Sequence, residues 1–484
     1  MSRTAITIQG ANDVPHPHPR GLLGSEPARM RPRTPRRPGT GPFRTLFLAC
    51  VAYAAPLAAG TQEAVAPLRP GEARRRWERR CQIRSEKFDL ILPAAMRDNG
   101  IDMWITVMRE GDLDPLWEDL GGGYVGGWAY YVFTDRGGER IERAALGVGG
   151  YSLEACGVYD HFGGDAELAG FVRARAPSRI GVNMASSIGT ADGLSHTSWQ
   201  HLRETLGEPW ASRLVSAEKL VSDFRARRTG AEIGAFAEAG EISREIAELA
   251  LSNQVIVPDV TTLEDVAWWM RDQLLARGLD SSFDMPSVYV TGPEGILATS
   301  TDRIIRRGDL LMIDWGVGFM GFYTDVKRIA YVLREGESAP PAGIQHAFER
   351  AVEVRRIMKR SIKPGRTAQR ALDETLAAIE AGGFRILEEF NRPTDHPGTE
   401  VVIGPHSVGD WGHGSGPSLA FFNPTRLTYE LVPTSLLSIE LFAWTPAPEW
   451  GGRKVRIPLE DDAVVTERGV EWLYPVTDRI LLVK

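Results

Sequence analysis

The chain has 484 residues, of which 43% are hydrophobic and 25% charged, and its formal net charge is −7. This composition is typical of a soluble globular protein, and the length exceeds that of one ordinary domain. Residues 1–80 hold 14 arginines and 5 acidic residues, a net charge of +9, which leaves −16 on the remainder. An acidic body argues against a nucleic-acid partner, and three cysteines are too few for a disulfide scaffold.

Residues 1–72 do not show the pattern of a folded domain. Residues 11–43 are rich in proline and arginine, and residues 46–52 form a short apolar stretch that leads into small residues. This order is the layout of a secretory signal peptide, and the apolar stretch is too short for a stable membrane span. We therefore expect an exported protein, periplasmic or extracellular. A disordered basic tail on a cytoplasmic enzyme is the alternative.

Residues 73–225 are predicted to form an α/β domain. Apolar residues recur at helical spacing over residues 74–96, and an Asn-Gly pair then ends the helix. Short apolar runs predict strands at residues 101–107, 130–134, 143–148 and 180–183. Helices that alternate with strands favour this fold class.

Residues 226–484 begin with helices and continue with strands. Thr229 and Thr262 have the sequence of N-caps, and each precedes a segment with helical spacing. Two further helices are expected at residues 344–361 and 367–380.

Two carboxylates lie beside apolar strands in this second part. Asp314 ends the apolar run 310–313, and Asp325 precedes the run 329–333, with a glycine-bearing turn between them. Buried carboxylates that face each other repel, and a divalent metal ion is the simplest way to keep both ionised. The alternative is a pair of surface aspartates on a hairpin.

Three more candidate ligands follow in or beside apolar segments: His413, Glu440 and Glu460. Together with the two aspartates they form an oxygen-rich set with one imidazole. Such a set suits two divalent ions such as Mn, Co or Zn.

These residues resemble the motifs of the pita-bread metallopeptidases, the family of methionine aminopeptidases, proline aminopeptidases and prolidases. The matching segments are Asp314-x-Gly316, Asp325 eleven positions later, Gly412-His413-x-x-Gly416, Ile439-Glu440 and Glu460-Asp461-Asp462. The resemblance implies an α+β protein in which a creatinase-type α/β domain, residues 73–225, precedes a C-terminal pita-bread domain, residues 226–484. It also implies a homodimer or a higher homo-oligomer, because the creatinase-type domain helps to build the oligomer in the proline-specific branch.

The resemblance further implies two divalent metal ions, with Mn expected and Co or Zn as alternatives. Their ligands would be Asp314, Asp325, His413, Glu440 and Glu460. Glu440 would also move the proton of the attacking water, so it is a candidate catalytic residue.

The histidine segment contains a second candidate, His406, seven residues before His413. Its form, His406-x-x-Gly409-x-x-Gly412-His413-x-x-Gly416, resembles a bacterial subgroup of the same family. We assign His413 to the metal and His406 to a catalytic role at the substrate or the oxyanion. Asp410 is the alternative ligand if the register lies three residues earlier.

The predicted function is that of a metal-dependent aminopeptidase or dipeptidase that acts on short peptides, with Xaa-Pro bonds as candidates. One departure concerns specificity: the family's substrate histidine, about seventeen residues before the first aspartate, is replaced by Leu297. Two alternatives remain, a non-hydrolytic binding protein with this fold and a creatinase-like hydrolase of a small guanidino substrate.

Overall fold

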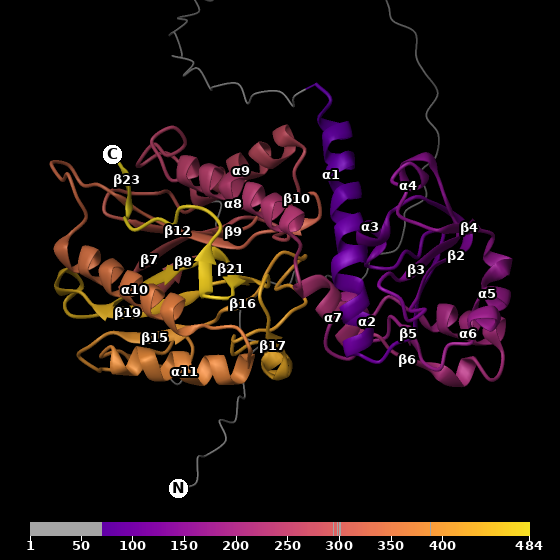
Figure 1. The fold of residues 1–484 in the computed structure, drawn as a ribbon. Coiled ribbons are helices and arrows are strands. Elements are labelled where there is room, and N and C mark those ends of the chain that lie inside the picture. Colours follow the sequence, from indigo (N-terminus) through magenta and orange to yellow (C-terminus); the bar gives the residue numbers. More distant parts are fainter. Residues whose placement is uncertain (1–69, 294, 298, 300–301, 388) are drawn as a thin grey trace, which may run out of the picture. The chain divides into compact units, whose positions relative to one another are not determined.

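The computed structural model describes residues 70–484 except 294, 298, 300–301 and 388 (Figure 1). The predicted signal peptide and the basic region before it lie outside the described residues. Within the described part, no helix is both long and apolar enough to cross a bilayer.

The N-terminal part is built on one six-stranded sheet, in the order β4-β3-β2-β1-β5-β6. Its strands are β1 (Met103–Arg109), β2 (Tyr124–Thr134), β3 (Glu142–Gly149), β4 (His161–Gly163), β5 (Ile180–Val182) and β6 (Leu214–Ser216). The four predicted strands are therefore confirmed, and two short edge strands are added. Sequential strands β1, β2 and β3 pair antiparallel, whereas β1 pairs parallel with β5.

Helices cover both faces of this sheet (Figure 1). Alternate residues of β1 point to opposite faces, so Trp104 packs with α2 (Leu92–Asp98) and α7 (Glu218–Ala226). Ile105 packs on the other face with α5 (Leu168–Arg175) and α6 (His196–Leu206). The predicted helix at residues 74–96 is confirmed as α1 (Glu72–Glu86), which continues through a π-helical turn into α2.

The C-terminal part has four long helices: α8 (Gly230–Ala250), α9 (Leu263–Arg277), α10 (Ala342–Ser361) and α11 (Ala368–Ala381). The predicted caps are confirmed, because Thr229 and Thr262 accept hydrogen bonds from the amides of Glu232 and Asp265, whose carboxylates bind the cap amides in return. These capping boxes explain why both helices begin where they do.

Three larger sheets and two two-stranded pairs lie among these helices in the described residues. The first large sheet has the order β23 (Leu481–Val483), β12, β9, β7 (Ser287–Gly292), β8. The second has the order β14 (Arg385–Ile386), β15, β19, β20, and the third β16, β18, β21, β22 (Gly469–Trp472). Strand β9 (Leu310–Trp315) has Ile313 on the side of α8 and α9, and Met312 in the core that includes α10. Both faces of the strand are thus buried, as the continuous apolar run predicted.

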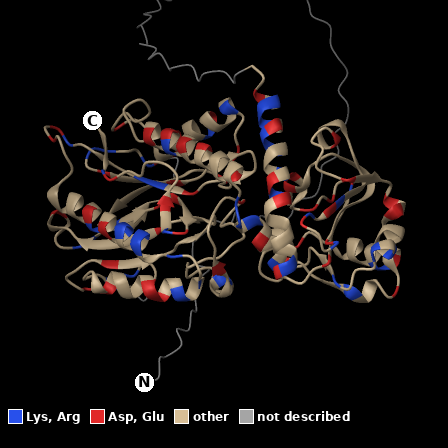
Figure 2. Cartoon of the chain, viewed as in Figure 1, with Lys and Arg blue, Asp and Glu red and all other residues tan. Residues whose placement is uncertain are grey.

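Helix α1 carries charges of both signs along its length, and Figure 2 shows them in alternation. Arg79 of α1 forms an ion pair of 2.5 Å with Glu238 of α8. Immediately after α1, the buried Lys87 binds the carboxylate of Glu232 at 2.8 Å and the carbonyl of Arg227 at 2.7 Å. The segment that begins with α1 is therefore bound to the start of α8 by charged contacts.

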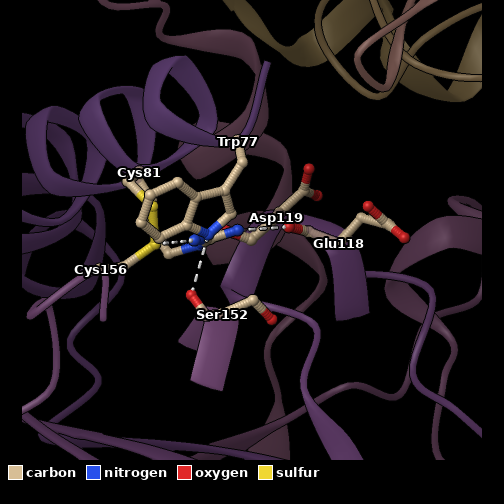
Figure 3. Close-up of a disulfide and its surroundings, with 7 residues drawn as sticks. Trp77, Cys81, Glu118, Asp119, Ser152 and Cys156 are labelled. Atoms are coloured by element: carbon tan, nitrogen blue, oxygen red, sulfur yellow. Dashed lines mark hydrogen bonds between the residues drawn. A yellow bond between two sulfur atoms is a disulfide. The ribbon is translucent and has the colours of Figure 1, made fainter. Parts of the chain in front are cut away.

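A disulfide between Cys81 and Cys156 joins α1 to the turn after α4 (Tyr151–Glu154), as Figure 3 shows. The Trp77 indole donates to the carbonyl of Ser152 at 3.0 Å beside it, and the Arg84 guanidinium donates to Cys156 Sγ at 3.5 Å. Spacing alone could not reveal the pair, because pairing depends on the fold. It is a single cross-link, not a scaffold.

Replacement of both cysteines by serine should lower the free energy of unfolding by about 4 kcal/mol, because the bond closes a long loop in the unfolded chain. The two cysteines are 75 residues apart. Urea denaturation of the variant and the parent, each with and without reductant, measures the effect. Reductant should bring the parent to the variant's midpoint; a parent curve that reductant does not move would contradict the cross-link.

Candidate metal centre

Two antiparallel strands bring the first acidic residues to one place. Strand β9 pairs with β12 (Val326–Val332), with Asp314 opposite Lys327, and Asp325 immediately precedes β12. The predicted connection is a short hairpin of β10 (Gly318–Phe319) and β11 (Phe322–Tyr323). Strand β12 begins three residues before the predicted run, and Lys327 therefore lies inside the strand.

Glu440 and Glu460 reach the same place from two other strand junctions. Glu440 separates β18 (Leu436–Ser438) from β19 (Leu441–Pro446), and Glu460 separates β20 (Lys454–Leu459) from β21 (Asp462–Thr466). The amide of Lys327 donates to the Glu460 carbonyl at 3.2 Å, which fixes β12 beside this junction. The four predicted carboxylates therefore converge; Glu460 is fully buried, whereas the side chain of Asp314 is 25% exposed.

His406 is the imidazole nearest to these carboxylates. It begins β16 (His406–Ser407), and its Nε2 lies 3.3 Å from Glu460 Oε1, 3.9 Å from Asp325 Oδ2 and 4.0 Å from Glu440 Oε2. Its Nδ1 donates to the Ser407 carbonyl at 3.0 Å, which directs Nε2 towards the carboxylates. Among the described residues, Asp325, His406 and Glu460 place ligand atoms within 4.8 Å of one another.

His413, the predicted ligand, lies outside this group. His413 is exposed. Its ring centroid lies 5.0 Å from that of His406 and 4.8 Å from that of Phe422. The structure therefore places His406, and not His413, beside the carboxylates, an exchange relative to the predicted positions.

The strand pattern explains this exchange. Strand β15 (Glu400–Ile403) pairs with β19, and the amide of Gly404 donates to the carbonyl of Glu440 at 3.0 Å, so the next residues pass beside Glu440. Gly412 and Gly414, both with positive φ, then turn the chain around His413. The signal available in the sequence was the apolar run 401–403, which ends just before His406 and not before His413.

Two other predicted positions serve different purposes. Asp410, the alternative ligand, forms a buried ion pair with Arg228 at 2.7 Å. Although burial opposes it, Arg228 holds the pKa of Asp410 well below its usual range. Leu297 lies on β8 (Gly295–Leu297) with 54% of its surface exposed.

Side chains of the N-terminal part support the histidine segment. Ser222 Oγ donates to the carbonyl of Ser415 at 2.8 Å, and Thr190 Oγ1 lies 3.0 Å from Ser415 Oγ. With the Arg228–Asp410 pair, these contacts hold the chain on both sides of His413.

Lys327 is a member of the cluster that the sequence motifs did not include. Its ammonium lies 2.7 Å from Glu440 Oε1, 2.5 Å from Glu460 Oε2 and 3.1 Å from Asp314 Oδ2. The period of a strand could have revealed it, because residues two apart share a face and Lys327 follows Asp325 by two.

Burial dominates the electrostatics of the carboxylates. It raises the pKa values of Asp314, Asp325 and Glu440, and Glu460 adds to the effect on Asp325. For Glu460, burial is outweighed by Lys327 and His406, which hold its pKa below the usual range. The pKa of Lys327 is raised well above its usual value, because the surrounding carboxylates outweigh its burial.

Among the buried carboxylate oxygens of the described residues that have no hydrogen-bond partner are Asp314 Oδ1 and Asp325 Oδ1. An unpaired buried carboxylate oxygen is unfavourable unless a cation completes it. Oxygen donors with one imidazole suit a hard or borderline divalent ion, so the donor set fits a metal. The residues present thus support divalent metal binding.

Helix-covered sheets whose strand junctions deliver four carboxylates and a histidine to one point define a pita-bread metallopeptidase fold. Residues 234–467 match the sequence profile of the metallopeptidase family M24. The match is confined to residues 234–467, just under half of the chain.

Individual proteins show the same similarity. An uncharacterised peptidase, YqhT, of Bacillus subtilis (strain 168) is 26% identical over 266 residues, 53% of this chain and 65% of that protein. An Xaa-Pro dipeptidase of Pyrococcus furiosus is 23% identical over 274 residues, 55% of this chain and 67% of that protein. The similarity thus spans about two thirds of the length of these curated relatives.

The fold extends the similarity to the N-terminal part. The crystal structure of an X-Pro aminopeptidase from Thermotoga maritima MSB8 superposes with a TM-score of 0.58 at 18% identity, and covers 80% of this chain and 99% of that chain. The two-part arrangement predicted from the sequence is therefore that of a solved structure.

Proposed function

We propose that this protein is a metal-dependent peptidase that hydrolyses short peptides, with Xaa-Pro bonds as the first candidates. The observation that carries the proposal is the convergence of Asp325, Glu440 and Glu460 on the buried His406, with one oxygen of Asp325 left unpaired. Lys327 and Arg456 neutralise only part of the charge of the four carboxylates, so a divalent cation would complete the charge balance of the buried site.

Asp325, His406 and Glu460 would hold the ion, for which Mn is proposed first and Co or Zn next. A bound divalent ion would supply Lewis-acid polarisation and a nucleophilic water at neutral pH. The Ser407 carbonyl orients His406, and the Ser438 hydroxyl donates to Glu460 Oε1 at 2.6 Å. Glu440, whose pKa is raised by burial, is the proposed carrier of the proton.

The names of the relatives support Xaa-Pro specificity, since they include an Xaa-Pro dipeptidase and an X-Pro aminopeptidase. Leu297 stands where the family resemblance leads us to expect a substrate histidine, and this departure leaves the choice of flanking residues to experiment.

Two further proposals concern the location of the protein and its oligomeric state. The Cys81–Cys156 disulfide supports export, because such bonds persist in oxidising compartments. Trp268 and Leu275, two large apolar side chains on α9 that are 54% and 80% exposed, support a homo-oligomer. Sedimentation velocity of the purified protein tests the second proposal.

A panel of Xaa-Pro dipeptides and tripeptides, with matched Xaa-Ala peptides as controls, tests the function. We expect hydrolysis of the Xaa-Pro members that is lost on chelation and restored by Mn²⁺, because the ion supplies the chemistry. Liquid chromatography of the products separates aminopeptidase from dipeptidase action. A protein that retains its metal but hydrolyses no member of the panel would favour the non-hydrolytic alternative.

A further inference from the structure

Lys327 lies on β12 with its side chain among the carboxylates of the cluster. It shares a face with Asp325, lies directly opposite Asp314 across the β9–β12 ladder, and its backbone amide binds Glu460. Its side chain is 7% exposed, so its ammonium cannot turn to solvent without leaving the cluster. The backbone register thus directs a permanent positive charge to the centre of the carboxylates.

Glu440 and Glu460 divide their oxygens between two partners. Each gives one oxygen to Lys327, at 2.7 and 2.5 Å, and directs the other towards His406 Nε2, at 4.0 and 3.3 Å. Asp314 completes the lysine side, and Asp325 completes the histidine side. The cluster is therefore made of two adjacent coordination positions bridged by two glutamates.

Both sides hold an unpaired carboxylate oxygen, but only the histidine side holds the metal-ligand group found among the described residues. Asp325, His406 and Glu460 supply ligand atoms within 4.8 Å of one another, and Asp325 Oδ1 is unpaired. On the lysine side, three carboxylate oxygens already surround the ammonium at 3.1 Å or less. A second ion there would have to displace Lys327 or bind against its charge.

The charge balance of the cluster also favours a single metal ion. Arg456 is buried near enough to Asp314 and Glu440 to interact with them electrostatically. With Lys327 and Arg456 present, one divalent ion would neutralise the four carboxylates, whereas two ions would leave two uncompensated positive charges in a buried site. Uncompensated buried charge is strongly unfavourable.

We propose that the ammonium group of Lys327 replaces the second metal ion, so that this centre binds a single divalent cation at Asp325, His406 and Glu460. The inference rests on the metal site of the proposed function, though not on peptide hydrolysis. It differs from the expectation of two ions that followed from the motifs.

Metal stoichiometry tests this inference. The full chain and Lys327→Ala are equilibrated with excess Mn²⁺, freed of unbound ion, and compared by native mass spectrometry and elemental analysis. We expect one ion per parent chain and two per variant chain, because alanine vacates the lysine side. Electron paramagnetic resonance should show an isolated Mn²⁺ signal in the parent and an exchange-coupled pair in the variant.

Control variants keep the test decisive. Lys327→Thr serves if alanine prevents folding, since threonine suits a strand and is also short. Lys359→Ala removes a lysine that pairs with Glu471, and it should bind one ion like the parent. A parent with two ions or none, or a folded Lys327 variant that still binds one, would overturn the inference. One ion per parent chain and two per variant chain, without peptide hydrolysis, would support the inference while the proposed function fails.

Discussion

His406→Ala should lose its metal ion and lower kcat/KM for peptide hydrolysis by roughly 10³-fold, which corresponds to about 4 kcal/mol of transition-state stabilisation. His406 Nε2 is the only imidazole nitrogen in the ligand group found among the described residues, and it is 1% exposed. His413→Ala is the matched variant. It should keep the metal content of the parent, because its ring contacts His406 and Phe422 and lies outside that group.

Elemental analysis and steady-state kinetics on the same preparations decide between the two histidines, with circular dichroism to verify folding. If His413→Ala lost the ion while His406→Ala retained it, the ligand assignment made from the sequence motif would be restored.

Glu232→Gln should lower the free energy of unfolding by about 3–5 kcal/mol, the range for a broken buried ion pair. Its carboxylate binds Lys87 at 2.8 Å, Arg228 at 3.2 Å and the amide of Thr229 at 2.8 Å. Each of these residues is less than 6% exposed, so water cannot replace the lost charge. Glutamine has nearly the same shape as glutamate, so the change in the free energy of unfolding reports the loss of the negative charge.

Urea denaturation measures this effect, and Glu78→Gln is the matched control. Glu78 pairs with Arg74 in α1, but their side chains are 60% and 77% exposed, so the control should change stability by less than about 0.5 kcal/mol. Equal midpoints for the two variants would show that the buried cluster contributes no more than a surface pair.

Local sequence patterns were sufficient to predict most of the helices and strands. The capping boxes at Thr229 and Thr262 are visible in the sequence because their partners lie three residues away. Asp314 and Glu440 were recognisable as site candidates because each stands at or beside an apolar strand.

The remaining features depend on pairing between distant segments. The choice between His406 and His413 was decided by the pairing of β15 with β19, which connects residues some forty positions apart. Lys327 became part of the cluster only because β12 extends further than its apolar run and its amide meets Glu460. Hydrophobic periodicity carries no information about such registers.

The contacts around Ser415 have a consequence for how the chain can be divided. Ser222 and Thr190 belong to the stretch predicted as the first domain, yet they hold the loop that presents His413 beside His406. The amino-terminal sheet and its helices thus serve as scaffolding for the chemistry of the other half. A boundary at residue 225 separates two patterns of sequence, but side-chain contacts cross it and support the site.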